Sequence, residues 1–82
     1  MSIHIYVGNL NYRMSEESLR KLFEQYGEVV SAKIIKDRMT GRSRGFGFVE
    51  MSDSEEANEA IKSLDGKEVE GRNLRVNRAK SQ

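Results

Sequence analysis

The 82-residue sequence contains no cysteine and no proline, and His4 is its only histidine. Without cysteine the chain has neither disulfides nor thiolate zinc sites, so it does not need an oxidising compartment and we expect a cytoplasmic location. One histidine, no thiol, and no serine or carboxylates grouped for catalysis argue against an enzyme. The glycines lack the spacing of a dinucleotide-binding or phosphate-binding loop. We therefore expect no catalytic residues, no cofactor and no metal.

Long hydrophobic runs are also missing. The longest purely apolar stretch is three residues, whereas a membrane-spanning helix needs roughly 20. Residues 1–4 lack the basic and apolar segments of a signal peptide. There are no repeats or low-complexity tracts, and the hydrophobic fraction of 37% suffices for a core without disulfides or metal. We expect a single monomeric domain, residues 1–82, with no membrane contact.

The segment Arg44-Gly45-Phe46-Gly47-Phe48-Val49-Glu50-Met51 is the most informative in the chain. In a β-strand, alternation puts its even-numbered residues, including Phe46 and Phe48, on one face. A core face would not carry a charge at each end, as this face does with Arg44 and Glu50. If the phenylalanines were ordinary core residues, two apolar side chains would point to solvent instead. We therefore predict an exposed aromatic face, which suits single-stranded nucleic acid.

This octapeptide resembles the longer signature of the RNA recognition motif family at every position but the last, where Met51 replaces an aromatic residue. Ile5-Tyr6-Val7-Gly8-Asn9-Leu10 resembles the shorter signature of that family. Alternation adds Tyr6 to the aromatic face if the two strands are neighbours. The resemblance runs from about Ile3 to Lys80. The chain is similar to small single-motif RNA-binding proteins of bacteria. The resemblance implies that the two strands lie next to each other in the middle of the sheet.

Periodicity and end signals predict two helices. The first covers residues 16–26, with Ser15 as N-cap and Gly27 as C-terminal cap. The second begins near Ser52 or Asp53 and ends before Gly66. The helix residues expected to face the core are Leu19, Leu22, Phe23, Tyr26, Ala57, Ala60, Ile61 and Leu64.

Strands are expected at residues 3–8, 29–37, 44–51 and 73–78, with a basic loop at 38–43 and a short turn or hairpin at 67–71. Among the inward-facing strand residues we expect Val30, Ala32, Ile34, Leu74 and Val76. The order β-α-β-β-α-β is the ferredoxin-like split βαβ arrangement of the α+β class. In that fold two helices pack on one face of a four-stranded antiparallel sheet and leave the other face bare.

Acidic and basic residues are separated along the chain, although the net charge is only +1. Residues 33–44 contain five basic side chains against one acid, and residues 72–80 contain four against none. Residues 50–70 contain eight acids against two lysines. Most charged stretches are only solvated surface, but here the basic ones fall on the strands and the loop that would border the aromatic face.

The resemblance implies roles for individual side chains. Tyr6 and Phe48 would each stack on a base, Phe46 would pack against a sugar or between two sugars, and Arg44 would pair with a phosphate. Further contacts are expected from Lys33, Arg42, Arg75 and Asn77, and at Arg78 from the backbone that follows it. The expected function is a non-enzymatic module for single-stranded RNA, with single-stranded DNA left open, in RNA metabolism or as an RNA chaperone.

The main alternative is a protein-binding module of the same fold that uses its sheet or its helix face for a peptide. Loss of the aromatic residues would favour that interpretation, and all three are present. Double-stranded DNA recognition is disfavoured, because neither predicted helix is basic along one face.

Overall fold

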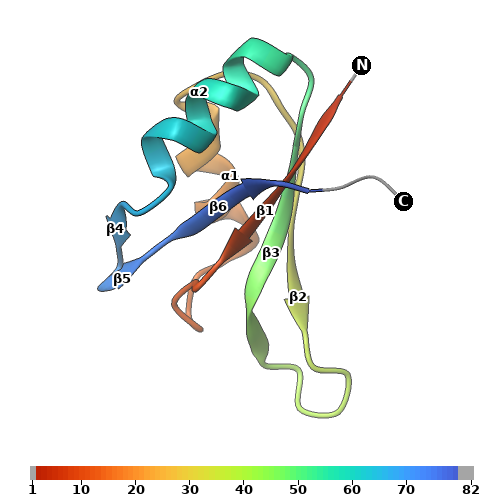
Figure 1. Ribbon diagram of the computed structural model, residues 1–82. Helices are drawn as coiled ribbons and strands as arrows, with labels where there is room; N and C mark the ends of the chain where they lie inside the picture. The colour runs from red at the N-terminus through yellow and green to blue at the C-terminus, as the bar shows by residue number, and fades with distance from the viewer. Residues whose placement is uncertain (1, 80–82) are drawn as a thin grey trace.

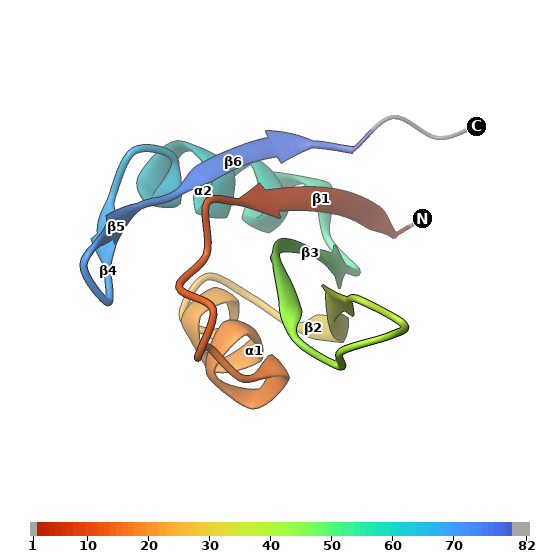
Figure 2. The same ribbon diagram turned by 90° about the horizontal axis from the view of Figure 1, so that it is seen from below.

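The computed structural model describes residues 2–79, so our expectations for Met1 and Lys80 lie outside the described residues. In chain order the elements are β1 (Ile3–Gly8), α1 (Glu16–Glu24), β2 (Val29–Lys36), β3 (Ser43–Met51), α2 (Ser54–Leu64), β4 (Glu68–Val69), β5 (Arg72–Asn73) and β6 (Arg75–Arg78). Strands β2, β3, β1 and β6 form one antiparallel sheet in that order, and β4 and β5 form a hairpin. Both helices lie on one side of the sheet (Figures 1 and 2). The predicted ferredoxin-like fold is confirmed.

Both helices begin at the capping residues that the sequence indicates. The Ser15 Oγ accepts a hydrogen bond from the Ser18 N–H at 3.1 Å, and the Asp53 Oδ1 accepts one from the Glu55 N–H at 3.3 Å. These side chains satisfy N–H groups that have no partner within the first turn. The two helix starts are therefore determined locally.

The end of α1 differs from the prediction. The helix stops at Glu24 with Gln25 as its C-cap, so the extension to residue 26 and the cap at Gly27 are wrong. The Tyr26 N–H bonds to the Phe23 carbonyl oxygen at 3.0 Å, which is the tighter turn with which many helices end. A turn of this kind needs no glycine in a left-handed conformation.

A β-bulge near the start of β2 overturns one inward-facing assignment. Val29 pairs with Met51 and Ser31 pairs with Glu50, so Val30 is an extra residue without a partner on β3. Val29 is 4% exposed and Val30 is 50% exposed. The prediction that Val30 faces the core is wrong, because the bulge directs the Val29 side chain inward instead.

The start of β3 is also irregular. Gly45 has a φ of +86°, and its N–H bonds to the Ser43 Oγ at 3.0 Å. The register with β2 shifts in the same region. Strict alternation therefore holds from Phe46 to Met51 but is interrupted between Arg44 and Phe46.

The expected last strand at residues 73–78 is divided in two. Residues 72–73 belong to the β4–β5 hairpin, which confirms the expected short hairpin and extends it. Leu74 bonds through its backbone to Lys67 (2.9 Å) and Gly66 (2.8 Å), and β6 pairs with β1 only from Arg75 onward. The inward orientation of Leu74 and Val76 is nevertheless confirmed, because both are buried.

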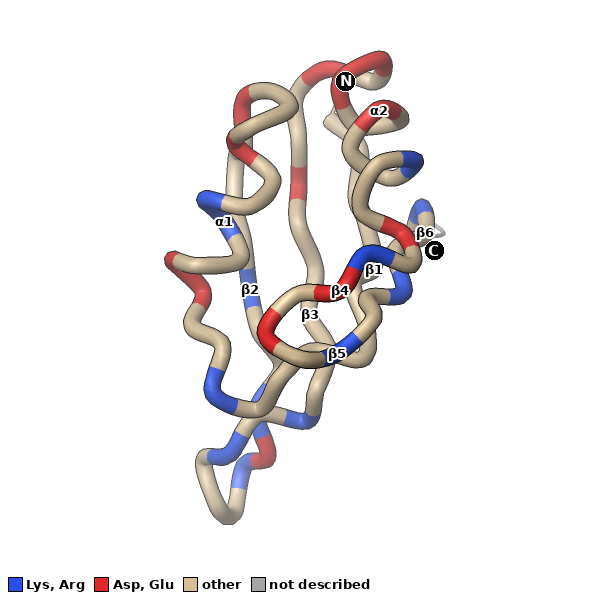
Figure 3. Tube along the Cα trace, turned by 90° about the vertical axis from the view of Figure 1, so that its left-hand side faces the viewer, with Lys and Arg blue, Asp and Glu red and all other residues tan. Residues whose placement is uncertain are grey.

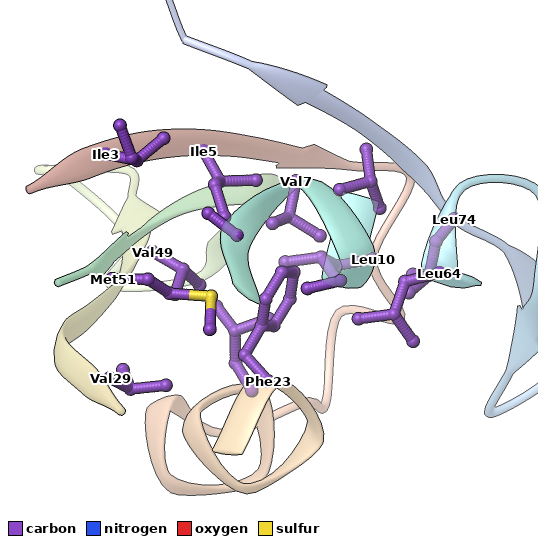
Figure 4. Packing of buried hydrophobic residues seen from close by; sticks show 14 of the residues in the cluster. Ile3, Ile5, Val7, Leu10, Phe23, Val29, Val49, Met51, Leu64 and Leu74 are labelled. Atoms are coloured by element: carbon purple, nitrogen blue, oxygen red, sulfur yellow. The ribbon is translucent and has the colours of Figure 1, made fainter. Parts of the chain in front are cut away.

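A single hydrophobic core fills the space between the sheet and the helices (Figure 4). Its largest fully buried side chains are Phe23, Ile5, Leu10, Leu19, Met51, Leu64, Leu74, Val7, Val49 and Val76. Burying them supplies most of the driving force for folding. No helix among residues 2–79 is long and apolar enough to cross a membrane.

Candidate nucleic-acid interface

The sheet face that the helices leave uncovered carries three aromatic rings from β1 and β3. The Tyr6 ring centroid lies 5.9 Å from those of Phe46 and Phe48, and these two are 6.2 Å apart. Phe48 is 37% exposed, and Tyr6 and Phe46 are half-buried. We call Tyr6, Phe46 and Phe48 the aromatic cluster. Its exposure and the adjacency of β1 and β3 confirm the predicted aromatic face.

One row across the sheet contains four of the predicted contact residues. Phe48 of β3 is in register with Lys33 of β2 on one side and with Tyr6 of β1 on the other. Tyr6 is in register with Asn77 of β6. Side chains directly opposite each other on neighbouring strands share a face. The row therefore places a basic and an amide side chain on the two sides of the aromatic rings.

The absence of a side chain at Gly8 leaves space for the Tyr6 ring on the sheet. A Cβ atom at Gly8 would overlap the Tyr6 ring and hydroxyl. The ring thus leans over the backbone two residues further along β1, where a larger residue would displace it. Although the sequence places Gly8 on the aromatic face, it does not indicate this contact.

A polar row lies beside the aromatic cluster. His4 is in register with Glu50, and its Nε2 lies 3.7 Å from the Glu50 Oε1. The Ser31 Oγ donates to the same carboxylate oxygen at 3.5 Å. The His4 side chain is 59% exposed, so it is open to solvent. Among the described residues no group of three or more His, Asp or Glu side chains could hold a metal.

The predicted basic contacts are distributed unevenly. Arg75 is in register with Gly8 and shares the face of the aromatic cluster. Arg78 is in register with Ile5, a core residue, so alternation directs its side chain away from that face. Arg42 and Arg44 are exposed at the end of the sheet where the β2–β3 loop enters β3.

Figure 3 shows the overall charge pattern from the helix side. Acidic segments lie on both helices and at β4, and basic segments lie along β2, in the loop after it and near β6 (Figure 3). This agrees with the charge separation expected from the sequence.

The sequence has no signal for a hollow that lies beside Arg42 at the end of the sheet. It measures about 620 Å³ and is lined by Tyr12, Arg13, Met14, Ser15, Lys36, Gly41, Arg42 and Ser43. Tyr12, which is 63% exposed, lies in the loop between β1 and α1. Loops have no periodicity from which exposure can be inferred. Only the proximity of the two loops reveals the hollow.

Comparison with known proteins identifies the family. The sequence profile of the RNA recognition motif matches residues 5–75. The chain belongs to the RNA recognition motif family. This RNA recognition motif is 55% identical over 76 residues to the putative RNA-binding protein RbpB of Nostoc sp., covering 93% of this chain and 74% of that protein. It is 52% identical over 79 residues to glycine-rich RNA-binding protein 4, mitochondrial, of Arabidopsis thaliana, covering 96% of this chain and 58% of that protein.

Solved structures agree with this assignment. This RNA recognition motif matches the crystal structure of RNA-binding protein PG1 with a TM-score of 0.94 and 56% identity, over 98% of this chain and 96% of that one. It matches the Rna15 domain with bound RNA (GU) with a TM-score of 0.86 and 31% identity, over 95% and 83% of the two chains. Other relatives are much longer: the chain spans 33% of the 28 kDa chloroplastic ribonucleoprotein of Spinacia oleracea.

Proposed function

We propose that this RNA recognition motif binds single-stranded RNA by stacking bases on its aromatic cluster. RNA binding without catalysis follows from membership of the family. The observation that supports the stacking proposal is the exposure of three neighbouring rings, with centroid distances of 5.9, 5.9 and 6.2 Å, on a sheet face that no helix covers. A base stacked on such a ring contributes about 1–3 kcal/mol, whichever base it is.

The positions of the rings support a division of roles. Phe48 and Tyr6 lie opposite each other in the middle of the sheet, where each ring meets a base. The Phe46 ring is tilted by 32° from Tyr6 and stands at 90° to Phe48. We assign it to a sugar, or to the space between two sugars. Arg44, which is exposed near the start of β3, pairs with a phosphate.

The residues around the cluster complete the proposed interface. Lys33 and Asn77, at the two sides of the aromatic row, have donors for base edges and phosphates. Arg42 and Arg75 contribute positive charge to the phosphates. At Arg78 the side chain points away from the cluster, so we assign the contact there to the backbone that follows it.

The wider setting also belongs to the proposal. We propose that residues 1–82 act as one monomeric module in the cytoplasm, in RNA metabolism or as an RNA chaperone. One core unites all the main elements, and the relatives include RbpB of Nostoc sp. alongside plant organellar proteins. Sedimentation equilibrium and cell fractionation test these two points.

The experiment that tests the function compares the wild type with a Tyr6→Ala/Phe48→Ala double variant. Each is titrated with random pools of single-stranded RNA, single-stranded DNA and duplex RNA, followed by fluorescence anisotropy. We expect the wild type to bind the single strands, and the double variant to lose most of that affinity while keeping its circular dichroism spectrum. Met39→Ala, a change at a fully solvated loop residue that is 94% exposed, serves as the control.

The alternative function makes the opposite prediction. If the sheet or the helix face binds a peptide instead, the wild type will not bind the single-stranded pools. If RNA is bound but the double variant retains full affinity, the interface lies away from the aromatic cluster.

A further inference from the structure

The hollow between the β1–α1 and β2–β3 loops has an unusual lining. Arg13, Lys36 and Arg42 border it together with Tyr12, and no acidic residue within residues 2–79 does. We call this site the Tyr12 hollow. Its volume of about 620 Å³ falls in the range of roughly 300–1,000 Å³ that is typical of small-molecule sites. Three cations without a carboxylate leave positive charge that only an anion can balance.

The Tyr12 side chain is held in place while its ring remains open to solvent. The Arg72 guanidinium lies over the ring, with Cζ 5.9 Å from the ring centroid. Two bonds from Arg72 to the Asn9 Oδ1, at 3.1 Å and 2.6 Å, fix the guanidinium. Asn9 in turn donates to the Asn73 carbonyl oxygen at 2.7 Å. Tyr12 is 63% exposed but its side chain is restrained, so the side chain loses little conformational entropy when a ligand stacks on it.

Tyr12, which lines the hollow, lies beside Gly45 of β3. A Cβ atom at Gly45 would lie 3.2 Å from the Tyr12 Cε1, and the Leu10 N–H bonds to the Gly45 carbonyl oxygen at 2.8 Å. The next residue in the chain is Phe46, a member of the cluster. A bound RNA strand that leaves the sheet face at the Phe46 end of the cluster would therefore contact the Tyr12 ring.

We propose that the Tyr12 hollow binds a flanking nucleotide of the same RNA strand that lies on the aromatic cluster. The base packs against the Tyr12 ring, and Arg13, Lys36 and Arg42 neutralise the adjoining phosphates. The proposal rests on the proposed function, since it extends the bound strand beyond the sheet. It assigns a role to two cations, Arg13 and Lys36, that the sheet face does not use.

The experiment uses two lengths of random-sequence single-stranded RNA. A probe of about three nucleotides covers the sheet aromatics, and one of about eight nucleotides extends past them at either end. We expect Tyr12→Ala to weaken binding of the long probe by roughly tenfold and to leave the short probe unchanged. Tyr12→Phe, which keeps the ring, restores the long-probe affinity.

Amide NMR spectra locate the contact directly. The long probe is expected to shift the signals of Tyr12, Arg13 and Gly41, and the short probe is not. Met39→Ala changes a residue in the β2–β3 loop that lies outside the hollow. This control should leave the affinities for the long and the short probe unchanged. Thermal melts of each variant show whether Tyr12 only supports the loop, in which case Tyr12→Ala lowers the melting temperature and weakens both probes alike.

The charged lining has a separate test. An Arg13→Gln/Lys36→Gln variant should make the salt dependence of long-probe binding shallower by about 1.4, from roughly 0.7 per phosphate, without affecting the short probe. Equal affinity of the wild type for both lengths, or equal effects of the variants on both, overturns the proposal about the hollow. Failure of the proposed function is distinguishable, because then Phe48→Ala has no effect on either probe.

Discussion

Met51 and Phe48 are three residues apart on β3 but lie on opposite faces of the sheet. Met51 is fully buried among the core residues, whereas Phe48 is 37% exposed beside Tyr6. The pleat of a strand separates them, since neighbouring side chains point to opposite faces. Substitutions at the two positions therefore test stability and recognition independently.

At Met51, restoring the aromatic residue typical of the family should have little effect on binding. Met51→Phe enlarges a side chain inside a packed core, which costs about 1–3 kcal/mol of stability, and the side chain has no route to the sheet face. We expect a lower melting temperature and an affinity for single-stranded RNA within about tenfold of the wild type, a free-energy change below about 1.4 kcal/mol. A larger loss of affinity in a folded variant would contradict the assignment of Met51 to the core side.

At Phe48 and Tyr6 the expectation is reversed. Phe48→Ala and Tyr6→Ala, each alone, should weaken single-strand binding by about 1–3 kcal/mol, the free energy of one base–aromatic stack. The fold should be retained, because both rings lie on the uncovered face. Titrations beside circular dichroism melts decide between the two effects, and a collapse of thermal stability would mean that the rings support the core.

At the scale of elements, the bulge in β2 determines which valine enters the core. A continuous strand would bury alternate residues from Val30 onward, but the extra residue in the β2–β3 ladder buries Val29 instead. Bulges of this kind arise from pairing between strands and have no local sequence signature here. Stability measurements on the two neighbouring valines test the register.

We expect Val29→Ala to lower the free energy of unfolding by about 1–3 kcal/mol, because it removes buried methyl groups and leaves a cavity. Val30→Ala, the matched control, should change it by less than about 0.5 kcal/mol. Urea unfolding of both variants measures the difference. Equal losses, or a greater loss at Val30, would show that β2 pairs without the bulge.

At the scale of the whole molecule, the distribution of charge matters more than its total. A net charge of +1 gives no strong long-range attraction for RNA. Acidic segments lie on both helices and at β4, and basic segments lie along β2, in the β2–β3 loop and near β6 (Figure 3). Binding should therefore depend on salt as strongly as for a more basic protein with the same contacts.

If three to five phosphates are neutralised, log affinity should fall against log salt with a slope of about −2 to −3.5, from roughly −0.7 per phosphate. Arg44→Ala should make this slope shallower by less than about one unit. Lys62→Ala, in the last turn of α2, should leave slope and affinity unchanged. If Lys62 matters as much as Arg44, or if binding ignores salt, the interface is not on the sheet and the peptide-binding alternative becomes the better one.

Most features that depend on neighbours along the chain could be predicted from the sequence. Alternation from Phe46 to Met51 separates aromatic from core residues, and the caps Ser15 and Asp53 start the helices. These signals are local, because strand pleating and capping involve residues no more than a few positions apart. The order of elements then limits the fold to the split βαβ arrangement.

The features that join distant segments depend on the tertiary structure. The packing of the strands extended the aromatic row to Asn77 and opened the bulge at Val30. It also brought Arg72 over Tyr12, sixty positions away in the chain, to shape the Tyr12 hollow. Such contacts depend on register and loop packing between elements, and a one-residue change in register reverses the face of every side chain that follows.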